Sequence, residues 1–142
     1  MRHLFSIWII LTVLATVRAQ DVPLAVYVEH SDTDHVGISV AYWTREFIRQ
    51  SQNYHLVSPN DPELKWIISI VSREVTAKLS KSDKTYSVLS VCFYIRYPQN
   101  LPVYLSHTVM FLNSDEVDKG AEQIIAELDK TVEKLLDTIP PE

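Results

Sequence analysis

Glycine is almost absent from this 142-residue sequence, which contains only Gly37 and Gly120. Phosphate-binding loops, dinucleotide-binding fingerprints and the nucleophile elbow of serine hydrolases all need glycines at fixed spacing. The sequence also lacks a His-Glu-x-x-His zinc motif and any pair of cysteines two residues apart. These absences exclude the glycine-dependent nucleotide-binding and hydrolase motifs and the commonest zinc motifs.

Cysteine is equally scarce, because Cys92 is the only one. No disulfide can form within the chain, so the fold must be held together by packing alone. Cys92 lies in the apolar run of residues 88–95, which is typical of a strand interior. We therefore interpret its thiol as buried and unreactive.

Basic residues are fewer than acidic ones, 13 against 18, and the formal net charge is −5. Residues 1–19 contain Arg2, Arg18 and no acid, so residues 20–142 have 11 basic and 18 acidic residues and a charge of −7. Nucleic-acid binding needs clustered Lys and Arg, and adsorption to an anionic membrane surface needs a basic patch. Neither nucleic acid nor an anionic membrane surface is expected as a partner.

The first nineteen residues resemble an export signal. Arg2 and His3 precede a short apolar run, and the small residues Val17 and Ala19 stand where a signal peptidase reads its site before Gln20. The run is too short to span a bilayer comfortably. We expect residues 1–19 to be a cleaved signal peptide, with residues 20–142 forming one domain that is periplasmic or secreted and not stably inserted in a membrane. An uncleaved anchor stays open as the alternative, because Arg18 directly precedes the cut.

The first half of the remaining sequence predicts a strand, a helix and a short strand. Residues 24–29 are rich in β-forming residues, and the following apolar positions recur at helical spacing as far as Ile48. Residues 32–34 supply the cap of this helix, which we expect to end near Ser51. Residues 54–57 then form a brief strand, in which His55 is expected to face solvent.

The second half predicts three long strands and a helix. The strands are expected at residues 65–79, 84–97 and 103–112, with a polar hairpin loop at residues 80–84. In the first of them the apolar positions change parity, which predicts a bulge or sharp twist at residues 71–73. The final helix is capped by Ser114 and carries an apolar stripe at helical spacing. The stripe consists of Val117, Ala121, Ile124, Ile125, Leu128, Val132, Leu135 and Leu136.

This order, β-α-β-β-β-β-α, with two one-sided helices, predicts an α+β fold. We expect a two-layer α/β sandwich with both helices on one face of a mostly antiparallel sheet. The face under the helices is predicted to carry Leu89, Val91, Phe93, Ile95, Val103, Leu105, Val109 and Phe111. His107 shares that parity and is expected to be a neutral, hydrogen-bonded core histidine. The open face is predicted to carry Ser90, Cys92, Tyr94, Tyr104, Ser106 and Thr108.

One phrase of the sequence resembles a known family. A helix ending in Phe-Ile-Arg-Gln-Ser at residues 47–51, followed by Asn-Tyr-His-Leu-Val at residues 53–57, is similar to the N-terminal domain of TolB. It is similar also to the periplasmic domains of the curli secretion protein CsgG and of penicillin-binding-protein activators. The resemblance implies a non-enzymatic adaptor or assembly module of the bacterial envelope. This chain departs from several members in having no lipid-anchor cysteine and no second domain.

The densest cluster of chemistry-bearing side chains is the segment of residues 29–35. Imidazole and carboxylate groups together suit zinc, nickel or copper, and the segment joins a predicted strand to a predicted helix. A metal site or a metal-assisted hydrolase would use His30, Asp32, Asp34 and His35. The competing interpretation, which we favour, is a turn whose Asp or Thr caps the helix.

The sequence thus favours an exported, non-enzymatic binding or assembly module over an enzyme, with no cofactor. Its partner would be a protein of the envelope or a second copy of the chain. The candidate contact residues are Tyr94, Tyr104, Ser106 and Thr108, because tyrosine is favoured where one surface binds another. The short strand at residues 54–57 is a second candidate, since it leaves an edge able to accept a pairing strand.

Overall fold

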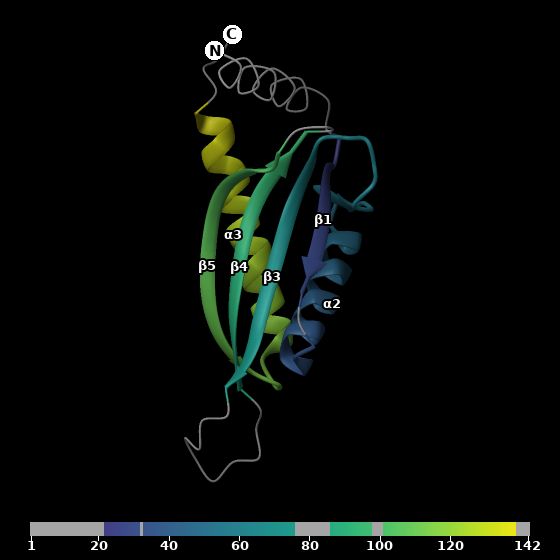
Figure 1. The fold of residues 1–142 in the computed structure, drawn as a ribbon. Helices are drawn as coiled ribbons and strands as arrows, with labels where there is room; N and C mark the ends of the chain where they lie inside the picture. Colours follow the sequence, from purple (N-terminus) through teal and green to yellow (C-terminus); the bar gives the residue numbers. More distant parts are fainter. Residues whose placement is uncertain (1–21, 32, 76–85, 98–100, 139–142) are drawn as a thin grey trace.

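The computed structural model describes residues 22–31, 33–75, 86–97 and 101–138. The predicted signal peptide, Asp32 and the hairpin loop at residues 80–84 lie outside them. The element order confirms the predicted β-α-β-β-β-β-α series (Figure 1). The elements are β1 (Leu24–His30), α2 (His35–Gln50), β2 (Tyr54–Leu56), β3 (Lys65–Val75), β4 (Tyr86–Arg96), β5 (Val103–Asn113) and α3 (Val117–Asp137).

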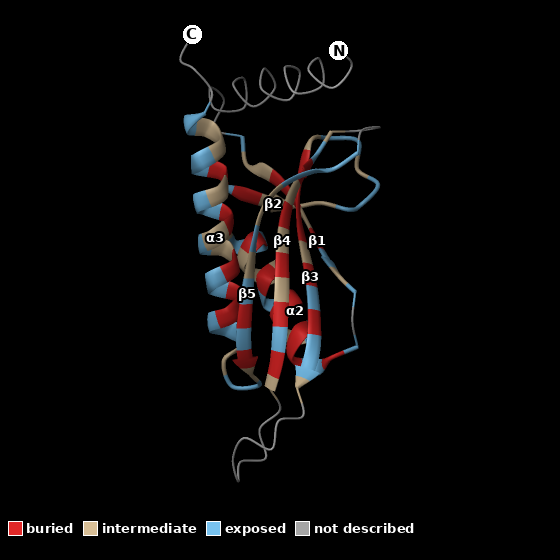
Figure 2. Cartoon of the chain, turned by 60° about the vertical axis from the view of Figure 1, so that its left-hand side comes forward, coloured by how far each residue is buried: buried red, intermediate tan, exposed pale blue. Residues whose placement is uncertain are grey.

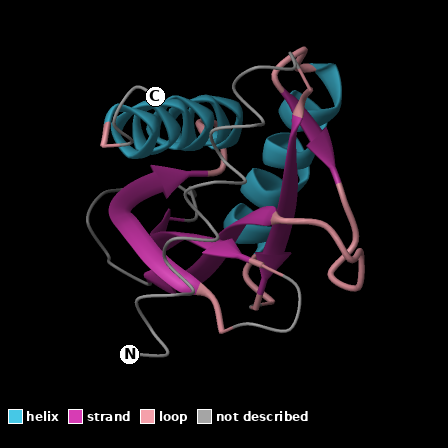
Figure 3. Ribbon diagram, turned by 90° about the horizontal axis from the view of Figure 1, so that it is seen from above, coloured by secondary structure: helices cyan, strands magenta, loops and turns pink. Residues whose placement is uncertain are grey.

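The strands form one five-stranded sheet in the order β2-β1-β3-β4-β5. The central strand pairs, β3 with β4 and β4 with β5, are antiparallel and long, whereas β1 pairs in parallel with β2 and β3 over shorter stretches. Both helices pack on the same face of the curved sheet, as Figure 3 shows from above. The predicted two-layer α+β arrangement is therefore confirmed.

Helix α2 begins as the sequence predicted. Asp34 is its N-cap and accepts a hydrogen bond from the backbone N–H of Gly37 at 3.1 Å. The other carboxylate oxygen of Asp34 accepts the hydroxyl of Ser87 on β4 at 2.9 Å. One buried aspartate thus satisfies an open helix N–H and ties the helix to the sheet.

Helix α3 begins differently from the prediction. Glu116, not Ser114, occupies the N-cap position, and no side chain caps the first turn. Glu116 instead accepts a hydrogen bond from the side chain of Asn113 at 2.7 Å, which fixes the turn between β5 and α3. The apolar stripe of α3 is confirmed in its centre, where Ala121, Ile124 and Leu128 are fully buried.

The predicted irregularity in β3 is wrong. Trp66, Ile68, Ile70 and Ser72 all face the helices, and β3 pairs with β4 without a shift from Lys65 to Val75. Val71 lies on the opposite face, so its apolar character does not signal a change of phase. Figure 2 shows the resulting alternation of buried and exposed residues along the strands.

The irregularity occurs instead between β4 and β5. Phe93 pairs with Ser106 and Tyr94 with Tyr104, so Leu105 is an extra residue on β5. A bulge of this kind reverses the parity of the strand on either side of it.

The predicted face of β5 is wrong beyond the bulge, whereas Leu105 packs against the core and Val103 pairs with the buried Ile95, as predicted. Register places Met110 opposite the buried Leu89 and leaves Val109 and Phe111 on the open face. Leu112 is also buried, packed against Gly120 of α3. The odd-numbered apolar residues of β5 beyond the bulge therefore point away from the helices.

Two of the four candidate contact residues consequently lie on the helix side of the sheet. Thr108 is paired with Val91, which is fully buried, and directly paired residues share a face. Ser106 bonds to Thr131 of α3 at 2.9 Å. The prediction for His107 is also wrong, because this residue is exposed on the open face and not buried in the core.

Candidate binding surface on the open sheet face

The open face of β3, β4 and β5 carries a band of exposed apolar side chains. Val71 is 47% exposed, Val88 37%, Val109 62% and Phe111 52%. Register brings them together, because Val88 pairs with Phe111, and Ser90 lies between Val71 and Val109. We call these four residues the apolar band.

Tyr86 extends the apolar band at the end of β4. Its ring stacks on Phe111 with the centroids 5.4 Å apart and the planes 11° from parallel. Stacking holds the Phe111 ring in one orientation although half of its surface meets solvent. Tyr86 and Phe111 therefore form one joined aromatic surface at this end of the apolar band.

A second, aromatic cluster lies on the same face near the other end of β5. The rings of Tyr94 and Tyr104 meet edge to face at 5.9 Å, and the Tyr104 hydroxyl lies 2.5 Å from Nδ1 of His107. The side-chain hydrogen bond with Cys92 is the main cause that raises the pKa of Tyr94 above its usual value. Tyr94 is neutral at ordinary pH, as a tyrosine with an ordinary pKa also is, and it presents its ring and hydroxyl group on this face.

Part of the open face next to β1 is covered by a loop of the chain itself. The loop of residues 57–64 connects β2 to β3, and the Lys65 ammonium donates to the carbonyls of Ser58 and Pro59, each at 2.9 Å. Lys65 and Ile67 have open-face parity and yet are buried, at 4% and 7% exposed. The loop thus covers the open face beside Lys65 and Ile67, whereas Glu29 near the other end of β1 is exposed on it.

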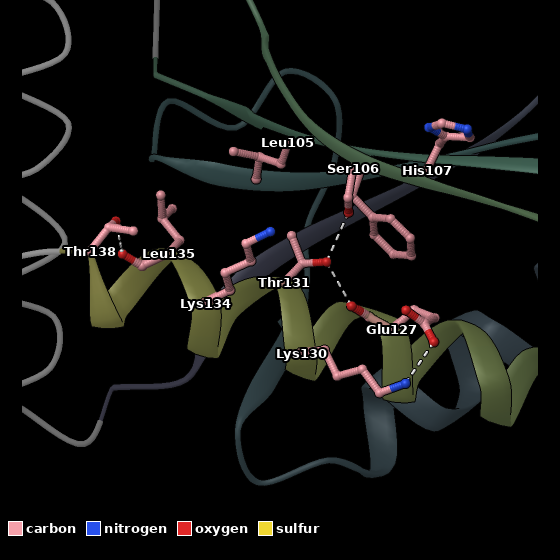
Figure 4. Close-up of a pocket in the computed structure, with 10 residues that line it drawn as sticks. Leu105, Ser106, His107, Glu127, Lys130, Thr131, Lys134, Leu135 and Thr138 are labelled. Carbon is pink, nitrogen blue, oxygen red and sulfur yellow. Dashed lines mark hydrogen bonds and ion pairs between the residues drawn. The ribbon is translucent and has the colours of Figure 1, made fainter.

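A groove of about 330 Å³ lies on the other side of β5, between that strand and α3 (Figure 4). Thr131 donates its hydroxyl to the carbonyl of Glu127 at 2.7 Å, so Ser106 is the donor in its bond to Thr131. Lys130 is paired with Glu127 at 2.8 Å. The bond from Ser106 to Thr131 links β5 to α3 and gives Ser106 a structural role, which removes it from the candidate contact surface.

The segment predicted as a metal site has other bonds. Both oxygens of Asp34 are engaged by Gly37 and Ser87, and Nε2 of His30 lies 3.2 Å from the Ser72 hydroxyl. His35 is exposed at the start of α2, and Asp32 lies outside the described residues. Among the residues that the structure describes, no group of three His, Cys, Asp or Glu side chains is placed to hold a metal ion.

The predicted short strand, β2, does form one edge of the sheet. Its Tyr54 is buried and donates its hydroxyl to Asp129 of α3. The side chain of His55 is 42% exposed, in agreement with the solvent-facing position predicted, and its Nδ1 lies 3.0 Å from the carbonyl oxygen of Pro23. The strand offers only three residues for pairing, so it is a poorer docking edge than the sequence suggested.

Comparisons with known proteins bear on the fold only. No protein-family model matches the chain, and no curated protein matches it in sequence. Among solved structures, it is similar to rare lipoprotein B from Shewanella oneidensis, with 12% identity, a TM-score of 0.45, and 78% of this chain and 98% of that chain covered.

Two further structures are similar at the same level. The hypothetical protein CT253 from Chlamydia trachomatis has 7% identity, a TM-score of 0.48, and 78% and 98% coverage of the two chains. A minor lipoprotein from Acinetobacter baumannii has 13% identity, a TM-score of 0.38, and 73% and 91% coverage. All three TM-scores are below 0.5, so the likeness adds no evidence on function.

The apolar band was not predicted from the sequence, because the alternation along residues 103–112 assigned Val109 and Phe111 to the core. One signal was available. β5 contains apolar residues of both parities, with Met110 and Leu112 on one side and Val109 and Phe111 on the other. A strand that is apolar on both faces of a two-layer fold must expose one of them.

Proposed function

We propose that this chain is an exported, non-enzymatic binding or assembly module of the bacterial cell envelope that acts through protein–protein contacts. The observation that carries the proposal is the apolar band, formed by Val71, Val88, Val109 and Phe111 on three neighbouring strands. Contiguous exposed apolar patches on small proteins commonly mark interaction surfaces.

The aromatic cluster supplies the polar part of the same surface. Tyr94 and Tyr104 combine broad apolar rings with hydroxyl groups, which suits them to contacts at the rim of an interface. They remain candidate contact residues, whereas Ser106 and Thr108 are withdrawn because they face the helices. The contact would thus extend from the apolar band to the tyrosines along β4 and β5.

The export part of the proposal is supported by the sequence of residues 1–19. No helix within the described residues is long and apolar enough to cross a membrane. Expression with its own leader, followed by mass measurement of the purified chain, tests this part directly. A mass that begins at Gln20 is expected, and a retained leader would favour the uncleaved anchor.

The binding part is tested by capture of partners from an envelope extract. We expect the wild-type chain to retain specific proteins, and Val71→Lys with Val88→Lys to lose them because two ammonium groups would be desolvated in the contact. Ile38→Lys is the matched control, since Ile38 is 46% exposed on α2 in the other layer. Equal capture by all three chains would contradict the proposal.

The aromatic end is tested by Tyr94→Glu with Tyr104→Glu in the same capture. We expect weaker retention of the same proteins, because the rings are lost and charge is introduced at the rim. Unchanged retention would confine the contact to the apolar band.

A further inference from the structure

The two edges of the sheet differ in the amount of unpaired backbone that they offer. β2 has three residues, whereas β5 has eleven and pairs only with β4. An edge strand presents a row of N–H and C=O groups that can pair with another strand. Among the described residues, most of this unpaired strand backbone therefore lies along β5.

The β5 edge lacks most of the features that commonly prevent edge pairing. Soluble proteins protect such edges with charged residues, prolines, short strands or bulges. β5 contains no Lys, Arg, Asp, Glu or Pro from Val103 to Asn113. Its one bulge lies at Leu105 and the backbone of Asn113 is bonded to Glu116, so the stretch of residues 106–112 is regular and unprotected.

The apolar band reaches this unprotected edge. Val109 and Phe111, two of its members, are on β5 itself and are 62% and 52% exposed. A strand added beside β5 would cover them from the side while its backbone pairs with β5. Backbone pairing and apolar burial would then act at the same place.

The distribution of charge favours the β5 edge over the β2 edge for pairing with a second copy of the chain. The chain is acidic overall, so two copies repel each other wherever acids predominate. Asp129, Glu133 and Asp137 line the side of α3 next to Tyr54, at the β2 edge. The side next to β5 carries Lys130 and Lys134 together with Glu127. A twofold contact at the β5 edge would therefore place the acidic β2 edges of the two copies at opposite ends of the dimer, where they repel each other least.

We infer that the chain forms a twofold dimer in which β5 pairs with β5 of a second copy. A strand that pairs with itself across a twofold axis runs antiparallel, and the two five-stranded sheets become one continuous sheet. The two apolar bands then join on the same open face. The inference rests on the proposed role of that face and names a second copy as one of its partners.

The test is the molar mass of the protein purified after export, measured by sedimentation over about a hundredfold concentration range. The wild type is expected to double its mass as concentration rises. The Val109→Lys variant should stay monomeric, because it places a charge on the edge strand, within the stretch that would pair with the second copy. Ile38→Lys is the matched control: it adds the same charge at a 46% exposed position of α2 in the other layer, and it should still form the dimer.

Hydrogen exchange gives a second measurement that needs no variant. Outward-pointing amides of residues 106–112 should exchange slowly in concentrated samples and rapidly on dilution, whereas those of β4 should be protected in both. A wild type that is monomeric throughout, or a dimer in which both Val109→Lys and Phe111→Lys persist, would overturn the inference. The proposed function would survive that result if Val71→Lys with Val88→Lys still abolished partner capture.

Discussion

The two faces of strands β3, β4 and β5 differ in how far their apolar side chains are exposed. On the covered face, Ile68, Leu89 and Val91 are completely buried, and the buried Asp34 is paired with Ser87 and Gly37. On the open face, Val71 and Val109 are about half exposed. Stability therefore resides mainly between the sheet and the helices, and the open face is available for contacts.

The largest loss of stability is expected for a substitution on the covered face, at Gly37, where α2 approaches β3. A Cβ added there would lie 1.8 Å from Oγ and 2.4 Å from Cβ of Ser72, and 2.8 Å from Nε2 of His30. Gly37→Ala should lower the free energy of unfolding by about 3 kcal/mol, because helix and strand must separate. Chemical denaturation measures it.

Gly120→Ala is the control for that substitution, since Gly120 is also a buried helical glycine. The added Cβ would meet only the end of the Leu112 side chain at 2.2 Å, and the next contact is at 3.5 Å. A flexible leucine can turn aside, so the loss should be smaller. Equal losses for both glycines would contradict the close approach of α2 to β3.

The second effect concerns the paired polar groups of the covered face. Asp34→Ala removes the cap of α2 and leaves the Gly37 N–H and the Ser87 hydroxyl without their acceptor. We expect a loss of about 2 to 3 kcal/mol in denaturation. Thr33→Ala, at an exposed position of the same turn, should change stability by less than about 0.5 kcal/mol.

The third effect concerns pH at the β2 edge. The pKa of Tyr54 is raised above its ordinary value of 10.0, mainly because the side chain is buried. The hydrogen bond to Asp129 and the negative charge of Asp129 raise it further. Tyr54 makes its full contribution to the stability of the fold at pH values below 10.0. This contribution is lost as pH rises, because the unfolded chain ionises while the folded Tyr54 does not.

Denaturation at about pH 9 and about pH 11 checks this. Tyr54→Phe should cost about 1 kcal/mol at neutral pH and should lessen the decline at high pH. Tyr42→Phe, which alters an exposed tyrosine on α2, is the control and should leave the decline as in the wild type. The same decline in all three chains would contradict the role of Tyr54.

The smallest effect is expected on the open face. Val71→Lys, which is designed to impair partner capture, should change the free energy of unfolding by less than about 0.5 kcal/mol. A loss comparable to that of Asp34→Ala would show that the apolar band supports the fold itself. The comparison of the two faces would then fail.

The covered layer could be predicted from sequence because its signals are local. The spacing of Val36, Val40 and Ile48 marks α2, the stripe of α3 marks the last helix, and Asp34 marks a cap. Each signal depends on residues within a few turns of one another. The order of elements and the two-layer arrangement follow from them.

The open face could not be predicted in the same way. Whether Val109 or Met110 faces the helices depends on register against β4, and the extra residue at Leu105 reverses that register beyond it. A bulge leaves no pattern within β5 alone. The misplaced residues, Val109 and Phe111, are also the ones that define the candidate surface.

The position of β1 inside the sheet has a consequence for how the chain folds. Val26 pairs with Trp66, which is synthesised forty residues later, whereas β3, β4, β5 and α3 join consecutive neighbours. Closing a long loop costs more entropy than closing a short one, so we expect the β-meander and α3 to form first and β1 to dock last. Pulsed hydrogen exchange should then protect β4 before β1. Until β3 has been synthesised, β1 can pair only with the three residues of β2.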